Sequence, residues 1–190
     1  MLHQDVEKVL VSEEEIDEIV RRIAGEIDRD YSRGGRFYVE GHEPKLLLIC
    51  ILKGSVVFMG ELMKRITLPV EIDFMKASSY GASTKTTGNV QIGLDLARAD
   101  IADLDILVIE DIIDSGRTLS FLVEHLKRRG AHSVRTCTLL DKPERREVDF
   151  HPDYVGRVIP DEFVVGYGLD YDEKYRALPY VGILKRSVYE

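Results

Sequence analysis

Two adjacent carboxylates and a short polar loop are the residues with the clearest chemistry in this chain. Glu110 and Asp111 end an apolar run, and the segment 114–118, Asp-Ser-Gly-Arg-Thr, follows shortly after them. If a helix begins in this loop, its unpaired backbone N–H groups and its dipole both favour a bound anion. The two carboxylates would repel a bare phosphate, so they require hydroxyl groups or a metal ion as partners. A sugar phosphate meets both needs, because its phosphate suits the loop and its ring hydroxyls suit the acids.

The residues on either side of this loop predict the elements that hold it. Residues 106–109 are apolar and largely β-branched, which is typical of a strand buried on both faces. A helix over 117–129, ended by Gly130, is predicted because apolar residues recur there at helical spacing. Asp114 and Ser115 could serve only as a helix cap, but the acids before them favour a functional loop. The apolar helical positions are Leu119, Leu122, Val123 and Leu126.

Strands and helices alternate through the middle of the chain, which predicts an α/β fold with a central, mostly parallel sheet flanked by helices. Ligands of such sheets bind beyond the carboxyl ends of the strands. Three polar segments, 53–54, 111–118 and 141–142, fall at these ends, so we expect them to meet in one site. The predicted strands are residues 46–52, 70–75, 90–94, 106–113 and 134–140.

Three further segments have recognisable patterns. Residues 12–15, Ser-Glu-Glu-Glu, match a helix capping box and precede an apolar helical face. Residues 78–89 are rich in Ser, Thr, Gly and Lys and contain almost nothing apolar, which predicts a mobile loop. Residues 145–190 contain prolines and many aromatics, and we expect loops and short strands that cover the site as a hood.

Segment 110–118 resembles the phosphoribosyl pyrophosphate (PRPP) signature of the type I phosphoribosyltransferases. Other segments narrow this resemblance to the hypoxanthine/guanine phosphoribosyltransferases, in chain order from about residue 45 to residue 184. Residues 52–54, Leu-Lys-Gly, resemble the pyrophosphate loop of that family, and residues 78–80, Ser-Ser-Tyr, resemble the start of its mobile active-site loop. Its purine-binding segments are matched by residues 141–143 and 160–176.

The resemblance implies one phosphoribosyltransferase domain over residues 1–190, with a small hood from C-terminal and N-terminal residues, mainly 145–190. It implies a purine salvage enzyme that transfers the 5-phosphoribosyl group of PRPP to hypoxanthine or guanine. The products would be IMP or GMP and pyrophosphate. The implied cofactor is Mg²⁺, the implied location is cytoplasmic, and a homodimer or homotetramer is the expected assembly.

The resemblance also implies roles for the residues of the central motif. Asp114 would be the catalytic acid or base, because bond formation at N9 of a purine requires a proton to leave the ring, and the family places this aspartate near N7. Glu110 and Asp111 would face the ribose hydroxyls and a Mg²⁺ ion that Asp170 helps to hold. Since side chains alternate along a strand, the two acids should point to opposite faces and have unequal roles. The 5′-phosphate would be bound by Ser115, Gly116, Arg117 and Thr118.

The remaining implied roles concern pyrophosphate, the base and closure of the site. Lys142 would donate to the 6-oxo group of the purine, Phe163 would stack on the ring, and backbone groups near Val164 would read its edge. The family often has a cis peptide bond between the positions of Leu52 and Lys53. Closure of the mobile loop would exclude water from the reaction. The loop begins with Ser78, Ser79 and Tyr80, and pyrophosphate would be held by Lys53, Gly54 and Arg176.

The overall composition limits which other functions the chain can have. A net charge of −8 over 190 residues argues against general nucleic-acid binding, which requires a basic surface. A regulator on the same fold that binds RNA or DNA is the rival from another class, and an enzyme for adenine or a pyrimidine is the third hypothesis. Lys142 and the segment around Phe163 favour a 6-oxopurine instead. We expect no membrane association, because no apolar run is long enough to cross a bilayer and residues 1–8 lack a signal-peptide pattern.

The cysteines and histidines give no sign of a further site. Cys50 and Cys137 lie in apolar, strand-like runs, so we expect buried free thiols. No Cys/His spacing fits a zinc site, and the five histidines show no metal or catalytic spacing. His125 and His132 lie near a predicted helix end, where surface or capping roles are expected.

Overall fold

A computed structural model describes residues 3–80 and 89–190 of the chain, and a six-stranded sheet forms its centre. Neighbouring strands of this sheet run parallel, except that β3 and β4 pair antiparallel. The predicted mostly parallel sheet is therefore confirmed. In spatial order its strands are β4 (Asn89–Leu94), β3 (Val70–Tyr80), β2 (Leu46–Ile51), β5 (Asp105–Ile113), β6 (Ser133–Asp141) and β7 (Tyr154–Val158).

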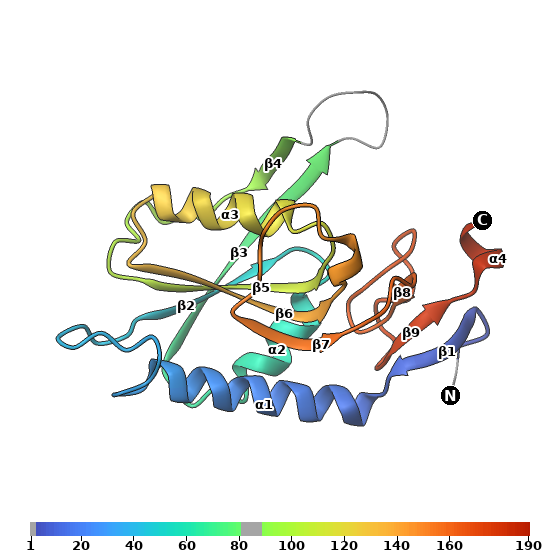
Figure 1. The fold of residues 1–190 in the computed structure, drawn as a ribbon, viewed down its shortest axis with the longest axis horizontal. Coiled ribbons are helices and arrows are strands. Elements are labelled where there is room, and N and C mark those ends of the chain that lie inside the picture. The colour runs from blue at the N-terminus through green and yellow to red at the C-terminus, as the bar shows by residue number, and fades with distance from the viewer. Residues whose placement is uncertain (1–2, 81–88) are drawn as a thin grey trace.

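Helices cover both faces of the main sheet, as Figure 1 shows. α3 packs on one face through the apolar positions that the sequence predicts, and α1 and α2 pack on the other. Every residue of β2 is buried, because this strand lies between two parallel neighbours and under both helical layers. The helices are α1 (Glu13–Tyr31), α2 (Val56–Met63) and α3 (Arg117–Arg128), and a short 3₁₀ turn, η1, covers Pro143–Arg145.

A second, three-stranded antiparallel sheet lies beside the carboxyl end of the main sheet (Figure 1). It joins residues from both parts of the predicted hood, because β1 from the start of the chain pairs with β9 near its end. The sequence pattern did not predict β1, whose exposed and buried residues alternate irregularly. The elements here are β1 (Val6–Val11), β8 (Val164–Val165), β9 (Val181–Leu184) and the short helix α4 (Arg186–Tyr189).

The polar segment that follows residue 77 differs from its prediction. β3 continues through Tyr80, and Ser78, Ser79 and Tyr80 pair with Gln91, Val90 and Asn89 of β4. The prediction of a loop from residue 78 is therefore wrong for residues 78–80, because backbone pairing in an antiparallel ribbon does not require apolar side chains. The prediction is wrong for Asn89 too, which is the first residue of β4, and residues 81–88 of the predicted loop lie outside the described residues.

Two smaller expectations can also be compared with the structure. Cys50 and Cys137 are free and buried, as predicted. His125 does more than occupy a helix end, since its Nε2 lies 2.8 Å from a carboxylate oxygen of Asp95. Within residues 3–80 and 89–190, no helix combines the length and the apolar character that crossing a bilayer requires.

The capping box at the start of α1 yields the first prediction. Ser12 Oγ accepts from the Glu15 N–H at 3.2 Å, and a Glu15 carboxylate oxygen accepts from the Ser12 N–H at 2.8 Å. Ser12→Ala removes one of these bonds, so it should lower the free energy of unfolding by about 1 kcal/mol. Urea unfolding would measure the change. The exposed Glu18→Ala on the same helix is the control and should change stability by less than about 0.5 kcal/mol; equal effects of the two variants would contradict the prediction.

Candidate active site

A cavity of about 540 Å³ opens at the carboxyl ends of β2, β3 and β5. Its walls come from the residues after β2, from the end of β5 with the loop into α3, and from the segment after β8. Two of the three polar segments that the sequence assigns to one site, 53–54 and 111–118, therefore meet around this cavity, because parallel strands all end at the same edge of a sheet. Lys142 of the third segment lines an adjoining cavity instead.

The loop between β5 and α3 presents a helix N-terminus to this cavity. Gly116 is the N-cap of α3 and has φ of +80°, in the left-handed region that glycine adopts with little strain. A Cβ at this position would lie 3.1 Å from side-chain atoms of Arg146 and Val148, so a larger residue would also displace them. Ser115 and Thr118 line the cavity with Gly116. Backbone N–H groups at the start of a twelve-residue helix are thus available to an anion.

Glu110 and Asp111 both line the cavity and lie close enough to interact directly. Poor solvation raises the pKa of both carboxyls, and the charge of Asp111 raises the pKa of Glu110 further. The Asp111 carboxylate accepts from the Ile112 N–H at 2.7 Å, which opposes the rise in its own pKa. Glu110 therefore keeps its proton to a higher pH than an isolated carboxyl does, and a cation near the pair would favour the ionised form of both acids.

Glu110 and Asp111 face the same cavity, although side chains alternate between the two faces of the sheet earlier in β5. Leu107 belongs to the core under α1 and α2, whereas Val108 belongs to the core under α3. Glu110 and Asp111 lie near the carboxyl end of the strand, and both side chains line the same cavity. The predicted opposite orientation therefore does not separate their surroundings.

Gly54 allows the backbone after β2 to approach Asp111 closely. A Cβ on residue 54 would lie 1.5 Å from an Asp111 carboxylate oxygen, a distance that no side chain can occupy. Gly168 approaches from the other side, and a Cβ there would lie 2.0 Å from the Gly54 carbonyl oxygen. Its φ of +102° also suits glycine. Glycines at both positions therefore let three separate segments close around the acid.

Charged residues of the segment after β8 connect the predicted pyrophosphate-binding groups. Lys53 Nζ lies 2.9 Å from a carboxylate oxygen of Glu173, and the Leu52–Lys53 peptide bond is cis. Arg176 pairs with the same glutamate at 3.2 Å and with Asp170 at 2.9 Å. Sequence reasoning missed Glu173, which lies in a run of alternating acids and bases and has no distinguishing spacing.

A second cavity, of about 450 Å³, adjoins the first. Asp114 and Asp170 line both cavities, so they lie at the boundary between them. Lys142 lines the second cavity, is only 6% exposed, and places its Nζ 3.9 Å from Asp114 Oδ1. That Asp114 oxygen is buried and accepts no hydrogen bond from the described residues, so it is available to a ligand.

Aromatic side chains form one wall of the second cavity. Phe163, which precedes β8, is 37% exposed, and its ring stacks on Tyr189 of α4 with a centroid separation of 4.8 Å. Tyr171 meets the Phe163 ring edge to face at 5.6 Å. Val164 is buried in β8 and also lines this cavity. Tyr189 was not predicted, because only the folding of the chain end onto β8 brings it here.

Two predicted groups are placed differently from the rest. Of the residues expected to bind phosphate, Arg117 directs its side chain away from the cavity and donates from Nε to Glu147 at 2.5 Å. Its backbone N–H donates to Ser115 Oγ at 3.3 Å. In the predicted loop start, Ser78 lines the cavity, but the side chains of Ser79 and Tyr80 lie outside what the structure describes.

Arg146 supports the loop from behind and was also missed. It donates to the Asp114 carbonyl at 2.7 Å and to the Asp141 carboxylate at 2.5 Å, with its side chain largely buried. Its sequence neighbours are charged, so its position resembles an ordinary surface arginine. Arg146 therefore fixes the backbone of Asp114 relative to the end of β6.

Comparison with known proteins identifies the family. Residues 11–172 match the family of phosphoribosyl transferase domains. The chain is 49% identical to the hypoxanthine-guanine phosphoribosyltransferase of Bacillus subtilis, over 100% of this chain and 99% of that protein. The chain belongs to the phosphoribosyltransferase family. Within this family, a solved structure of a hypoxanthine phosphoribosyltransferase from Staphylococcus aureus superposes with a TM-score of 0.89 at 46% identity, covering 99% of this chain and 96% of that one.

Some relatives are much longer than this phosphoribosyltransferase. The bifunctional protein TilS/HprT of Listeria monocytogenes serotype 4b is 51% identical over 188 residues. The match includes 99% of this chain but only 27% of the length of the Listeria protein. The similarity to that protein therefore concerns one part of it.

The raised pKa of Glu110 predicts a pH-dependent effect on the stability of this phosphoribosyltransferase. Above about pH 4.3 the unfolded chain ionises this residue, whereas the folded protein holds the proton to higher pH, so rising pH favours unfolding. Glu110→Gln removes that penalty and should stabilise the ligand-free protein at pH 7, with a smaller gain at pH 4. Urea unfolding at both pH values measures this difference. Glu144→Gln, at an exposed carboxyl, is the control; a gain from Glu110→Gln that does not grow with pH would refute the interpretation.

Proposed function

We propose that the chain transfers the 5-phosphoribosyl group of PRPP to hypoxanthine or guanine, giving IMP or GMP and pyrophosphate, in purine salvage. The observation that carries this proposal is the position of Asp114 between two adjoining cavities. One cavity has a helix N-terminus and an acid pair, which suit a sugar phosphate. The other has a buried lysine and an exposed aromatic ring, which suit a planar base. A carboxylate at their boundary reaches the point where base and sugar would join.

PRPP would occupy the first cavity with its 5′-phosphate at the start of α3. Backbone N–H groups and the hydroxyls of Ser115 and Thr118 bind the phosphate. The carboxyls of Glu110 and Asp111 face the ribose 2′- and 3′-hydroxyls. Pyrophosphate then lies toward Gly54, with its charges contacted by Lys53 and Arg176, which first release Glu173.

The acids of the first cavity fit Mg²⁺. Glu110 and Asp111 are crowded enough to retain a proton, and Asp170 adds a third carboxylate at the cavity wall. Oxygen donors of this kind, together with substrate oxygens, are what Mg²⁺ prefers. The bound ion would neutralise charge on the departing pyrophosphate. Replacing the shared proton by a cation also relieves the repulsion between the two acids.

The base would be read by a lysine and a carboxylate together. O6 and N7 lie next to each other on one edge of a 6-oxopurine. Lys142 Nζ and Asp114 Oδ1 are 3.9 Å apart, so one can donate to O6 while the other accepts the N7 proton. Phe163 stacks on the ring, and backbone groups near Val164 contact the opposite edge. Acceptance of the N7 proton by Asp114 raises the electron density at N9, which attacks the anomeric carbon.

The chain's own groups would promote this displacement mainly by position and charge. As pyrophosphate leaves, positive charge develops on the ribose ring, and the Asp114 carboxylate lies near enough to stabilise it. Arg146 holds the backbone of that residue, which keeps the carboxylate aligned between the two cavities. The ribbon that contains Ser78, Ser79 and Tyr80 would cover the reacting groups and exclude water.

Other parts of the proposal rest on the family rather than on the cavities. We propose one domain over residues 1–190, a homodimer or homotetramer, and a cytoplasmic location. We propose no nucleic-acid partner and no membrane association; the net charge of −8 supports the former. The rival function is a regulator that binds PRPP and nucleic acid without turnover.

Replacing Asp114 tests the proposed chemistry. Purified protein would be incubated with PRPP, Mg²⁺ and one base at a time, comparing hypoxanthine, guanine, xanthine, adenine and uracil. Asp114→Asn keeps the shape but cannot accept the N7 proton, so kcat should fall by about 10²- to 10⁴-fold while the KM for PRPP changes little. Asp149→Asn, at a carboxylate that is 97% exposed, is the control.

Two results would overturn this proposal in different ways. An Asp114→Asn variant with unchanged kcat would remove Asp114 from the reaction but leave the activity itself. Absence of nucleotide formation by the wild-type protein with every base, despite PRPP binding, would favour the regulator.

Replacing Lys142 tests recognition of the base. Lys142→Ala removes the donor to O6, and loss of a charged hydrogen bond of about 1.5–3 kcal/mol corresponds to a KM for hypoxanthine roughly 10- to 100-fold higher. The KM for PRPP should be almost unchanged. Steady-state kinetics with each substrate varied would show this separation, and Lys127→Ala, on the exposed side of α3, is the control. Unchanged hypoxanthine kinetics would mean that another group reads the 6-oxo position.

A further inference from the structure

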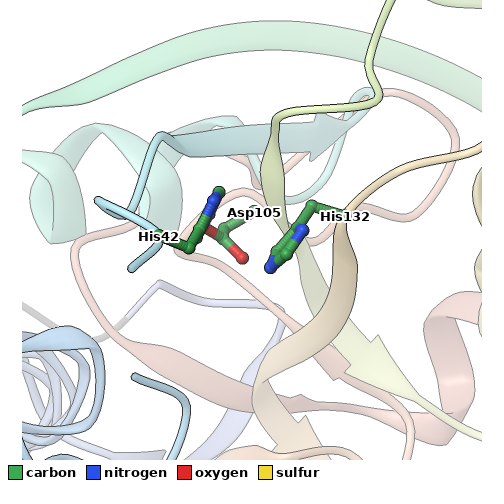
Figure 2. Close-up of side chains that lie close together, drawn as sticks. All are labelled: His42, Asp105 and His132. Carbon is green, nitrogen blue, oxygen red and sulfur yellow. The ribbon is translucent and has the colours of Figure 1, made fainter. Parts of the chain in front are cut away.

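Three residues that are far apart in the sequence meet at the edge of the main sheet opposite the two cavities. His42 precedes β2, Asp105 is the first residue of β5, and His132 precedes β6. One potential ligand atom from each lies within 4.8 Å of the others. Figure 2 shows the two imidazole rings side by side, with the carboxylate of Asp105 next to them.

Asp105 is a buried carboxylate with few compensating charges. Its side chain is 3% exposed and accepts from Ser133 Oγ at 2.6 Å and from the Lys45 N–H at 3.3 Å. Across residues 3–80 and 89–190 it forms no ion pair with a lysine or an arginine, and His42 Nε2 at 2.8 Å is its only ion-pair partner. Buried charges are ordinarily paired or bind a metal ion. Hydrogen bonds and one histidine therefore stabilise this carboxylate, and among the described residues no permanently charged side chain pairs with it.

The two histidines supply the right kind of donor beside it. Their rings stack with centroids 3.7 Å apart and planes 17° from parallel, so two imidazolium cations would repel each other here. Neutral imidazole nitrogens with one carboxylate are a ligand set typical of zinc and related first-row ions. Magnesium prefers oxygen ligands alone and would bind this set poorly.

We propose that His42, Asp105 and His132 bind one Zn²⁺ ion or a similar first-row divalent ion. Bonds of about 2.1 Å place two ligand atoms of one zinc ion at most about 4.2 Å apart, so the cluster must contract slightly and the stacked His132 ring must turn to direct a nitrogen at the ion. His132 is exposed and can make that movement. The ion takes the place of the proton shared by His42 Nε2 and Asp105 Oδ2. Water completes the coordination from the exposed side.

The site would act on stability rather than on phosphoribosyl transfer. Glu110 lies five positions after Asp105 along β5, which is roughly 16 Å of strand. The ion would tie the connection between α1 and β2, residues 32–45, to the starts of β5 and β6. Because the unfolded chain does not hold these three groups together, binding favours the folded state.

Thermal unfolding with added ZnCl₂ tests the proposal on the full chain after treatment with EDTA. A zinc concentration about 100-fold above the dissociation constant should raise the Tm by about 5 °C or more. His132→Ala removes an exposed ligand and should abolish most of that rise. His151→Ala removes a histidine whose side chain is 85% exposed and lies outside the cluster, so it should retain the rise. Equal shifts in wild type and His132→Ala would overturn the proposal.

A second measurement separates this site from the carboxylates of the cavities. Cobalt(II) bound by two imidazoles and a carboxylate in a four-coordinate site gives an intense visible absorption that all-oxygen sites do not give. The proposal expects this band in the wild type and in Asp170→Asn, its loss in His132→Ala, and its displacement by zinc but not by magnesium. A wild-type protein without the band, or a band that survives in His132→Ala, would contradict the assignment.

Discussion

The end of β5 holds two neighbouring carboxyls, Glu110 and Asp111, where water reaches them poorly, and this crowding of acid governs much of the surrounding structure. A chain that only had to fold would gain from apolar residues here. Instead the strand has two acids near its end, and burial raises the pKa of both, with the charge of Asp111 raising that of Glu110 further. Such an arrangement is unfavourable in the free protein and becomes favourable when a cation or sugar hydroxyls arrive. The site is thus prepared for its ligand at the expense of stability.

The chain segments around Glu110 and Asp111 leave the cavity beside these two acids open. Gly54 and Gly168 lack the Cβ atoms that would collide with Asp111 and with the neighbouring backbone, so three chain segments come together without filling the cavity. The nearby basic side chains, Lys53 and Arg176, do not pair with these two acids but with Glu173. The Lys53–Glu173 pair is largely solvent-exposed and therefore weak, and Arg176 keeps its second partner, Asp170, if it releases Glu173. A pyrophosphate group can replace Glu173 as their partner with little loss.

Much of this could be predicted from the sequence, because the relevant information was local. The apolar runs of β2, β5 and β6 identify buried parallel strands, and the polar residues directly after each run must then lie at one edge. β1 was missed because its identity depends on pairing with β9, nearly the whole chain away. Tyr189 and Arg146 were missed for the same reason, since only the folded chain brings them to Phe163 and Asp114. The continuation of β3 through Tyr80 was missed because its backbone pairing leaves no apolar pattern.

The cluster of His42, Asp105 and His132 shows that the spacing of residues in the sequence does not reveal every potential metal site. His42, Asp105 and His132 have no mutual periodicity, and yet the parallel arrangement that gathers the carboxyl ends of the strands at one edge gathers their amino ends at the other. β5 consequently begins with one poorly solvated carboxylate, Asp105, and has two more, Glu110 and Asp111, near its other end. At its end the acids adjoin a large cavity, and oxygen-rich surroundings suit magnesium and a sugar. At its start the acid adjoins two imidazoles, whose nitrogen donors suit zinc rather than magnesium. Poorly solvated carboxylates therefore favour a nearby cation toward both ends of β5, and the neighbouring donor atoms determine which cation fits each place.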